Sequence, residues 1–564
     1  MKKPDKFKFG AAMAMAMALV FYAGTGAWAQ LDTDVPGGHI KLQTALETEW
    51  GIHTAGKNNR NNNNNHIPGS GQGLSTDGND VQAAVGRIDP LITYRGSDEF
   101  SRMMGLDNFD AYVHLRFLGD AANLINGPSV YEFGRGAYHT PGQSRYPGDA
   151  WSAYVGEHEY EFDVNEAYLD FRKGPVALRL GKQQIVYGEE LGLQTLDQVD
   201  SLNFASVPGF FDIASLEFSD IRIGEWTAKL SYQLPDFPET GINNSIITGF
   251  VSPDFQPDYL YGLGQQLNDE PVRFPIGDYG NLRKARNKIV YGAVAATTIY
   301  GVDLTANFYS TPNHTGWFAL APVQLRGLPP GFSPDPIAGA PFLAPFGIKT
   351  LFDINIQRRF SRDFIYGGSA SYTIPTLDFP GADVLNGDIF HFSAAYIPHK
   401  SFWTTQSFAA PPNVIKPTRI GEINATLDGE RYIRWSQKLP SMYLLGEWNY
   451  KSRSTVISTV YEPSIGHKGI HTVVLSLTQP LPSNIWVLGI VAICDTNVGG
   501  NWFMQPNITY KPTSNQEYNV FWNFAEGTAL RLGRGHTNPL AGTGSKLGSY
   551  NWLDAIYFRA LYKM

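Results

Sequence analysis

Charged and amide side chains gather between residues 161 and 212, in a spacing that suits contact with polar solutes. Arg179, Gly181 and Gln183 alternate along a strand-like segment, so they share one face of it. Five carboxylates before and after this segment are candidate partners for Arg179. Charged rings and inserted loops set selectivity in pores, but charges of this kind also tie strands together structurally. Both interpretations stay open for Glu166, Asp170, Glu189, Asp197 and Asp200.

Motifs that mark common enzymes are missing from the sequence. It contains no His-Glu-x-x-His, Gly-x-Ser-x-Gly, phosphate-binding loop or paired-cysteine metal site. His467 and His471 are four residues apart, a spacing that joins ligands only on a helix, and Gly466 and Gly469 disfavour one. No spacing supports a hydrolase built from Ser476 and His471. We therefore expect no enzyme, no metal and no cofactor.

A two-residue rhythm of apolar side chains recurs along the chain and indicates strands with one apolar and one polar face. It is clear in the segments 109–117, 302–310 and 556–564. In the first of these, the apolar positions alternate with Asp110, Tyr112, His114 and Arg116. The apolar residues are Phe109, Ala111, Val113, Leu115 and Phe117.

Residues 1–29 have the features of an export signal. A head with four lysines precedes an apolar stretch from Gly10 to Ala23, and Ala27-Trp28-Ala29 offers a cleavage site. The stretch is short for a transmembrane helix, which needs about 20 residues. The predicted mature chain is therefore 30–564, exported across the inner membrane.

The charge and the cysteine content argue against a nucleic-acid-binding protein and against a disulfide-stabilised exported protein. The net charge of −8 becomes more negative when the lysine-rich signal is removed, and no basic patch suggests nucleic acid as a partner. Cys494 is the one cysteine, so no intrachain disulfide forms, and its apolar run from Ile485 predicts a packed, unreactive thiol. That run has the length of a transmembrane strand, about 9–11 residues.

Connections between the predicted strands alternate between short and long. Lys173-Gly174-Pro175 and Ile299-Tyr300-Gly301 indicate tight turns, while Pro235–Arg286 and Ser401–Gly429 are expected to be long connections. A compact soluble domain rarely carries many long loops, whereas membrane barrels combine long extracellular loops with short periplasmic turns. The alternating C-terminal segment also suits a terminal barrel strand, although it ends in Met564.

One local motif resembles a known family. The core Gly181-Lys182-Gln183 and the ending Tyr187-Gly188-Glu189 resemble the outer-membrane family called domain of unknown function 1302. In that family the ending is Trp-Gly-Glu, and an Asn-Pro stands where this chain has Asp200-Ser201. The alginate-export porins, with a similar Gly-Arg-Gln strand, are a second resemblance. The similarity is strongest over residues 161–212, and both resemblances imply a barrel that conducts or exports something.

The predicted architecture is an all-β, single transmembrane antiparallel barrel of about 16 strands, within roughly 14–18. Residues 189–212 are expected to insert into the lumen, with Asp197–Phe211 forming a short helix or loop. The expected function is an outer-membrane channel or export pore, with membrane lipid and an unidentified solute or polymer as partners. The alternative is a scaffold or receptor that binds a surface polymer or a protein through loops such as Thr311–Gly347.

Overall fold

The structure is a computed structural model. It describes residues 31–54, 81–120, 160–188, 195–202, 222–253, 255–256, 288–314, 317–320, 356–375, 387–402, 418–452, 469–495, 501–526 and 555–563.

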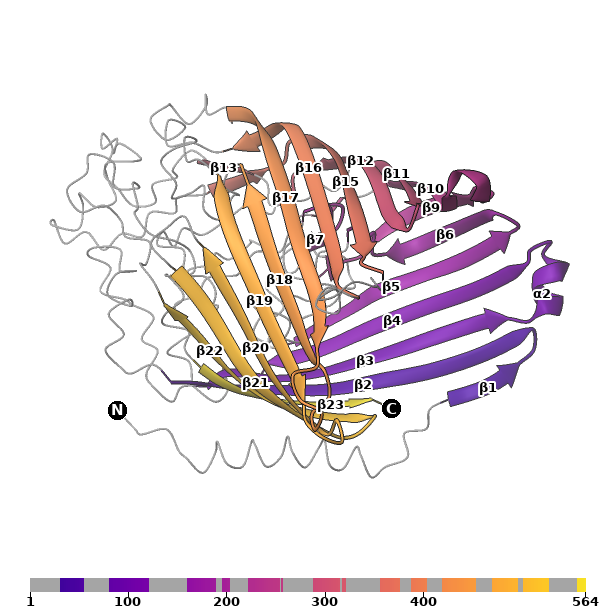
Figure 1. Cartoon of the computed structure of the whole chain (residues 1–564). Helices are drawn as coiled ribbons and strands as arrows, with labels where there is room; N and C mark the ends of the chain where they lie inside the picture. The colour runs from indigo at the N-terminus through magenta and orange to yellow at the C-terminus, as the bar shows by residue number, and fades with distance from the viewer. Residues whose placement is uncertain are drawn as a thin grey trace, which may run out of the picture.

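Within these residues, eighteen antiparallel strands form one closed ring (Figure 1). Each strand pairs with the next in the described order, and the last pairs with the first. The strands are β2 (Gly38–His53), β3 (Val81–Gly96), β4 (Asn108–Asp120), β5 (Tyr160–Lys173), β6 (Val176–Gln183), β9 (Glu225–Gln233), β10 (Ile242–Ser252), β11 (Val290–Ile299), β12 (Val302–Pro312), β15 (Arg362–Thr373), β16 (Ile389–Phe402), β17 (Thr418–Ile433), β18 (Met442–Lys451), β19 (Ile470–Pro480), β20 (Trp486–Asp495), β21 (Asn501–Thr513), β22 (Gln516–Glu526) and β23 (Ala555–Lys563).

Five short strands and two short helices complete the described elements. Strand β1 (Leu31–Val35) extends the sheet beside the start of β2, in line with β23. Two small sheets stand apart from the ring, one of β7 with β8 and one of β13 with β14. The bounds are β7 (Ser201–Leu202), β8 (Arg222–Ile223), β13 (Trp317–Leu320), β14 (Ile356–Arg359), α2 (Asp98–Met103) and the 3₁₀ helix η1 (Pro238–Thr240).

The ring closes between the first and last barrel strands. Residues Ala45–His53 of β2 pair with Ala555–Lys563 of β23, which confirms the C-terminal segment as the closing strand. Closure leaves no unpaired edge in the ring, as a sheet surrounded by hydrocarbon requires. The fold confirms the predicted barrel, and its strand number lies at the upper end of the expected range.

Two of the predicted long connections contain strands, and those expectations were wrong. Strand β10 lies within Pro235–Arg286, and most of β17 lies within Ser401–Gly429. Both strands carry Asn, Ser or Gly at several positions, residues that are typical of turns. In a barrel these small polar residues are compatible with strands because one face lines the interior. The tight turns at 174–175 and 300–301 are confirmed.

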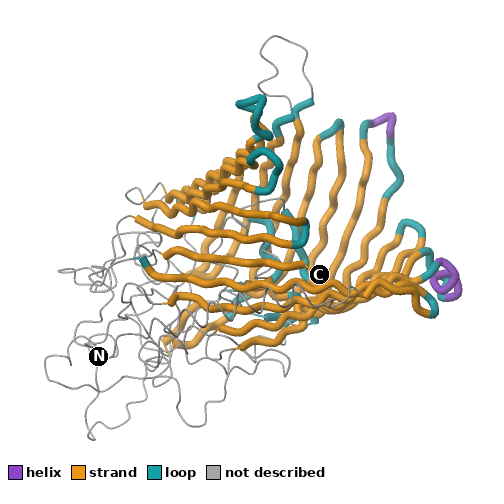
Figure 2. Tube along the Cα trace, turned by 90° about the horizontal axis from the view of Figure 1, so that it is seen from below, coloured by secondary structure: helices purple, strands orange, loops and turns teal. Residues whose placement is uncertain are grey.

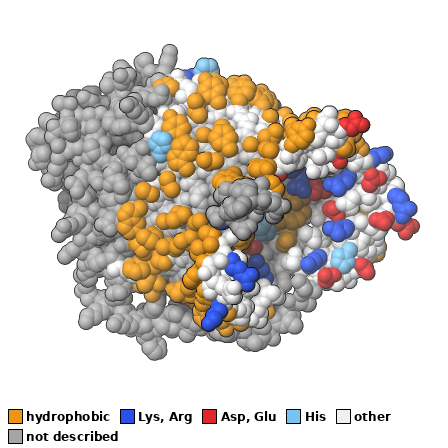
Figure 3. Space-filling view, in the orientation of Figure 1, with side chains coloured by type: hydrophobic (Ala, Val, Ile, Leu, Met, Phe, Trp, Pro, Cys, Tyr) orange, Lys and Arg blue, Asp and Glu red, His pale blue; other side chains and the backbone are white. Residues whose placement is uncertain are grey.

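The alternation of side chains shows which face lies outside. Along β17, Ile423 and Leu427 are 48% and 46% exposed, whereas Asn424, Thr426 and Asp428 are at most 2% exposed. A closed ring has one outer and one inner face, so the apolar series covers the outside and the polar series points inward. Figure 3 shows apolar side chains spread over the outer wall, with charged side chains gathered at the end that holds β1 and α2.

The two ends of the barrel differ. The described turns and helix α2 lie together at one end of the strands (Figure 2). Connections at the other end are mostly longer, as from Pro312 of β12 to Arg362 of β15. By the general rule for these barrels, the long connections are extracellular. No helix in the described part of the chain has the length and apolar character needed to cross a membrane.

Replacing Gly181 by Ala tests the close packing of β5 against β6. Gly181 has a φ of +143°, and a Cβ there would lie 2.2 Å from the carbonyl oxygen of Ala167. We expect Gly181→Ala to lower the free energy of unfolding by about 1–3 kcal/mol, measured by urea unfolding in lipid vesicles. In the control Gly249→Ala, the added Cβ has no neighbour within 4 Å. Equal stability of the two variants would contradict this account.

The candidate pore interior

An ionic network lines the inner wall beside the closing seam. Nε of Arg559 on β23 lies 2.8 Å from a carboxylate oxygen of Glu47 on β2, and Arg87 of β3 lies 3.6 Å from the same carboxylate. Arg87 also pairs with Asp89, whose other oxygen is 3.6 Å from Arg116 of β4. Positive and negative groups therefore alternate across four strands. All five side chains are at most 13% exposed.

Arg179 pairs with Asp170, one of its five candidate partners, on the inner face of β5 and β6. The guanidinium donates to both carboxylate oxygens, through Nε at 2.7 Å and Nη2 at 2.8 Å. It also lies 4.0 Å above the ring of Tyr168, whose other neighbour, Tyr112, stacks at a centroid distance of 4.7 Å. A two-point ion pair backed by an aromatic ring holds Arg179 in one orientation.

The family-like motif ties three strands together. Lys182 donates to the carbonyl of Val164 at 2.5 Å and to Asp163 at 3.0 Å, where β5 shifts register against β4. Gln183 is fully buried and donates to the carbonyl of Thr227 on β9 at 2.8 Å. Glu166 accepts from the backbone N–H of Gln184 at 3.1 Å.

Residues 195–202 are held near the end of β6 by two carboxylates. Asp197 accepts from Arg222, and Asp200 accepts from the backbone N–H of Ile185 at 2.5 Å. Burial raises the pKa of Asp200 well above its usual range, and the nearby carboxylates of Glu225 and Asp197 act in the same direction. Asp200 therefore keeps its proton to a higher pH than an exposed aspartate does.

The same segment also contacts strands on a distant part of the ring. Thr195 shares a hydrogen bond with Thr426 of β17 and accepts from Asn449 of β18 at 3.2 Å. Asn449 donates in addition to Asn424 at 2.9 Å. These partners all belong to the inward-facing series, so residues 195–202 touch the inner wall at β17 and β18 as well as near β6.

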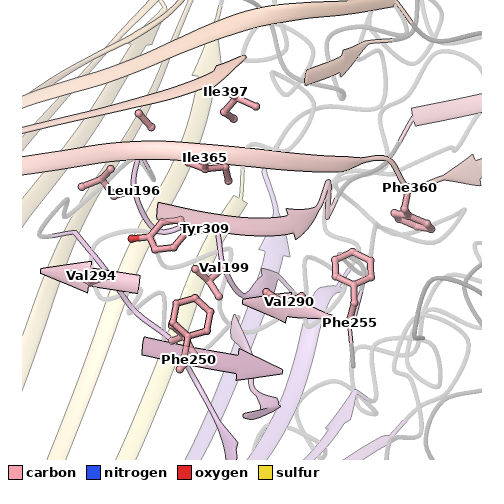
Figure 4. Packing of buried hydrophobic residues seen from close by; sticks show 12 residues of the cluster. Leu196, Val199, Phe250, Phe255, Val290, Val294, Tyr309, Phe360, Ile365 and Ile397 are labelled. Carbon is pink, nitrogen blue, oxygen red and sulfur yellow. The ribbon is translucent and has the colours of Figure 1, made fainter. Parts of the chain in front are cut away.

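An apolar cluster surrounds the middle of this segment. Leu196 is fully buried, and a Cβ on Gly367 of β15 would lie 2.4 Å from its Cδ2, so this glycine leaves the space that Leu196 occupies. Figure 4 shows Leu196 and Val199 among buried side chains from β10, β11, β12, β15 and β16. The cluster consists of Ile185, Leu196, Val199, Phe250, Phe255, Val290, Val294, Tyr309, Phe360, Ile365, Ala395 and Ile397, with Tyr187 packed against it.

The structure thus joins some predicted site residues and separates others. Arg179 pairs with Asp170, while Asp197, Asp200, Glu166 and Gln183 bind other groups, as described above. Glu189 lies outside the described residues, as do 190–194 and 203–212. The sequence analysis missed the network of Glu47, Arg87, Asp89 and Arg559. The one signal that could have pointed to this network was the alternation of polar residues along these strands.

These features define an outer-membrane-type β-barrel with a polar wall and an apolar cluster inside it. Residues 9–264 match the model of the family described as "Protein of unknown function (DUF1302)", which confirms the resemblance seen in the motif. The similarity to alginate-export porins stays a prediction. No curated protein matches the chain.

Solved porin structures also align with the chain at low identity. OmpF of Salmonella typhi, in complex with daunomycin, is 9% identical with a TM-score of 0.37, and the alignment covers 95% of this chain and 100% of OmpF. OccAB1 of Acinetobacter baumannii is 8% identical with a TM-score of 0.39, over 93% and 96% of the two chains. OccAB4 of the same organism is 7% identical with a TM-score of 0.41, over 95% and 99%.

Filling the space at Gly367 should loosen residues 195–202. We expect Gly367→Ala to push Leu196 out of place, so that a cysteine at position 198 reacts several-fold faster with a maleimide. The reporter is Gln198→Cys in a Cys494→Ser background. Gly368→Ala is the matched control, because its Cβ would meet the carbonyl of Thr305 at 2.6 Å without reaching Leu196. Equal rates in both variants would show that Leu196 is not held at Gly367.

Proposed function

We propose that the protein is an outer-membrane channel or export pore whose lumen is narrowed by residues 189–212. The observation that carries this proposal is the double attachment of residues 195–202, by Asp200 near β6 and by Thr195 at β17 and β18. A segment fixed at both sides of a barrel reduces the open cross-section, and inserted segments of this kind set selectivity in pores. The chain reaches the outer membrane after its signal, 1–29, is removed.

In this proposal the charged wall selects what passes. Arg179 and Asp170 keep 29% and 32% of their side-chain surface exposed, so a solute in the lumen meets both charges. Glu166, Glu189, Asp197 and Asp200 complete the constriction, and Gln183 fixes the wall behind it. A wall of paired charges favours hydrated polar solutes over apolar ones, because apolar solutes cannot replace the water that such groups bind.

The buried apolar cluster around Leu196 supports a second candidate function. If residues 189–212 seal the lumen, the barrel serves as a scaffold or receptor that binds a surface polymer or a partner protein through its loops. Conductance separates the two candidates, because a sealed barrel passes no current.

Deleting residues 189–212 tests the narrowing directly. We expect the single-channel conductance of the purified protein in planar bilayers to rise, because the deletion removes the segment that crosses the lumen. The matched control replaces residues 195–202 by an equally long Gly/Ser sequence, which keeps the chain length but loses the apolar and carboxylate contacts.

The control should give an intermediate, noisier conductance. Unchanged conductance on deletion would refute the narrowing. Absence of current in the intact protein together with a large current after deletion would favour the scaffold or receptor over the pore.

A further inference from the structure

An arginine stands on the outer face of the barrel, where most side chains are apolar. Arg362 is the first residue of β15, and it has the same parity as Phe364 and Tyr366, which are 39% and 48% exposed. Side chains two residues apart on a strand share a face, so Arg362 points outward. It lies at the end of the barrel with the long connections, since the chain enters β15 from the connection that follows β12.

Neutral groups from two neighbouring strands hold this guanidinium in place. Nη1 donates to the hydroxyl of Ser310 on β12 at 2.7 Å, and Nη2 donates to the carbonyl of Ile289, next to β11, at 2.8 Å. The guanidinium carbon also lies 5.9 Å from the ring centroid of Tyr291. Among the described residues, no carboxylate forms an ion pair with Arg362. These bonds fix the guanidinium in position, and none of the groups that they join to it is acidic.

A second cation lies close to the first. Lys288 precedes β11 and donates to the carbonyl of Phe360, and it too lacks a carboxylate partner within the described part of the chain. Burial lowers the pKa of Lys288, and the nearby charge of Arg362 lowers it further. The two positive groups thus repel each other, and an anion bound between them would relieve that repulsion.

Along the barrel axis, Arg362 and Lys288 lie at the level expected for the lipid headgroups. The outward positions from Phe364 to Tyr372 hold only apolar, aromatic or small residues, with aromatic residues at both ends. Such a band has the length of a membrane-crossing strand, about 9–11 residues, with aromatic girdles at its two interfaces. Phe308 of β12 contacts Tyr366 at 5.3 Å between ring centroids, which extends the girdle to the next strand. Arg362 and Lys288 lie immediately beyond this girdle, on the extracellular side.

We propose that Arg362 and Lys288 form a binding site for the phosphate group of an anionic lipid in the outer leaflet. Arginine presents several N–H donors in a planar fork that fits phosphate, and lysine adds a point charge. The acyl chains of the same lipid would lie along Tyr291, Phe308 and Tyr366. The acyl-chain contact distinguishes a lipid from free phosphate as the ligand, and the site is independent of whether the lumen conducts.

Native mass spectrometry of the full-length protein tests the site. The protein is purified in detergent micelles that contain either phosphatidic acid or diacylglycerol with the same acyl chains. We expect the wild type to retain phosphatidic acid but not diacylglycerol. The double variant Arg362→Gln/Lys288→Gln should show an occupancy by phosphatidic acid at least five-fold lower than that of the wild type. The matched control is Arg95→Gln, a strongly exposed cation on β3 at the opposite end of the barrel, which should bind as the wild type does.

A further arm adds inorganic phosphate as a competitor. Displacement of the lipid by equimolar phosphate would show that free phosphate, and not a lipid, is the ligand. Equal retention of phosphatidic acid by wild type and double variant, or equal retention of diacylglycerol, would also overturn the proposal. If the double variant does not fold, Ser310→Ala replaces it. Loss of the 2.7 Å hydrogen bond should loosen Arg362 and lower the occupancy, and unchanged occupancy counts against the site.

Discussion

The structure depends on hydrogen bonds between backbone groups, because inside hydrocarbon no water can take the place of a missing partner. Inside hydrocarbon, an unpaired N–H or carbonyl costs several kcal/mol, so a sheet must close on itself. Pairing of β2 with β23 meets this requirement and brings the first and last strands of the ring together. Once the ring is closed, lipid covers one face, and the strands must be apolar on that side and free to be polar on the other.

A polar interior then has to satisfy its own charges. The chain from Arg559 through Glu47 and Arg87 to Asp89 does so by alternating signs, and Arg179 with Asp170 does so through a two-point pair. Buried charges without partners would be costly, whereas paired ones fix side-chain positions. Against this polar wall, the apolar cluster around Leu196 is the exception. It gives residues 195–202 a defined place that hydrogen bonds at Thr195 and Asp200 complete.

The features that could be predicted from the sequence are those set by short, local patterns of residues. The alternation in β4, β12 and β23, the turn at Gly174 and the family-like motif were all evident from short stretches of sequence. Strands β10 and β17 were missed because small polar residues, which suit turns, also suit a lumen-facing strand side. Arg179 and Asp170 are nine residues apart, and Asp170 was one of five carboxylates that the sequence offered as partners for Arg179. Arg559 meets Glu47 through ring closure, and Thr195 meets Asn449 because residues 195–202 reach the inner wall at β18. Neither contact is encoded by a local sequence pattern.

The most direct test of this account asks whether lipid covers the apolar face. Spin labels placed singly at positions 423 to 428 of β17 in reconstituted vesicles report contact with oxygen, which concentrates in lipid, and with a water-soluble nickel complex. The account predicts oxygen maxima at 423, 425 and 427 with a two-residue period, and minima at 424, 426 and 428. Maxima for the nickel complex at 423, 425 and 427, or no alternation, would contradict a membrane-embedded barrel.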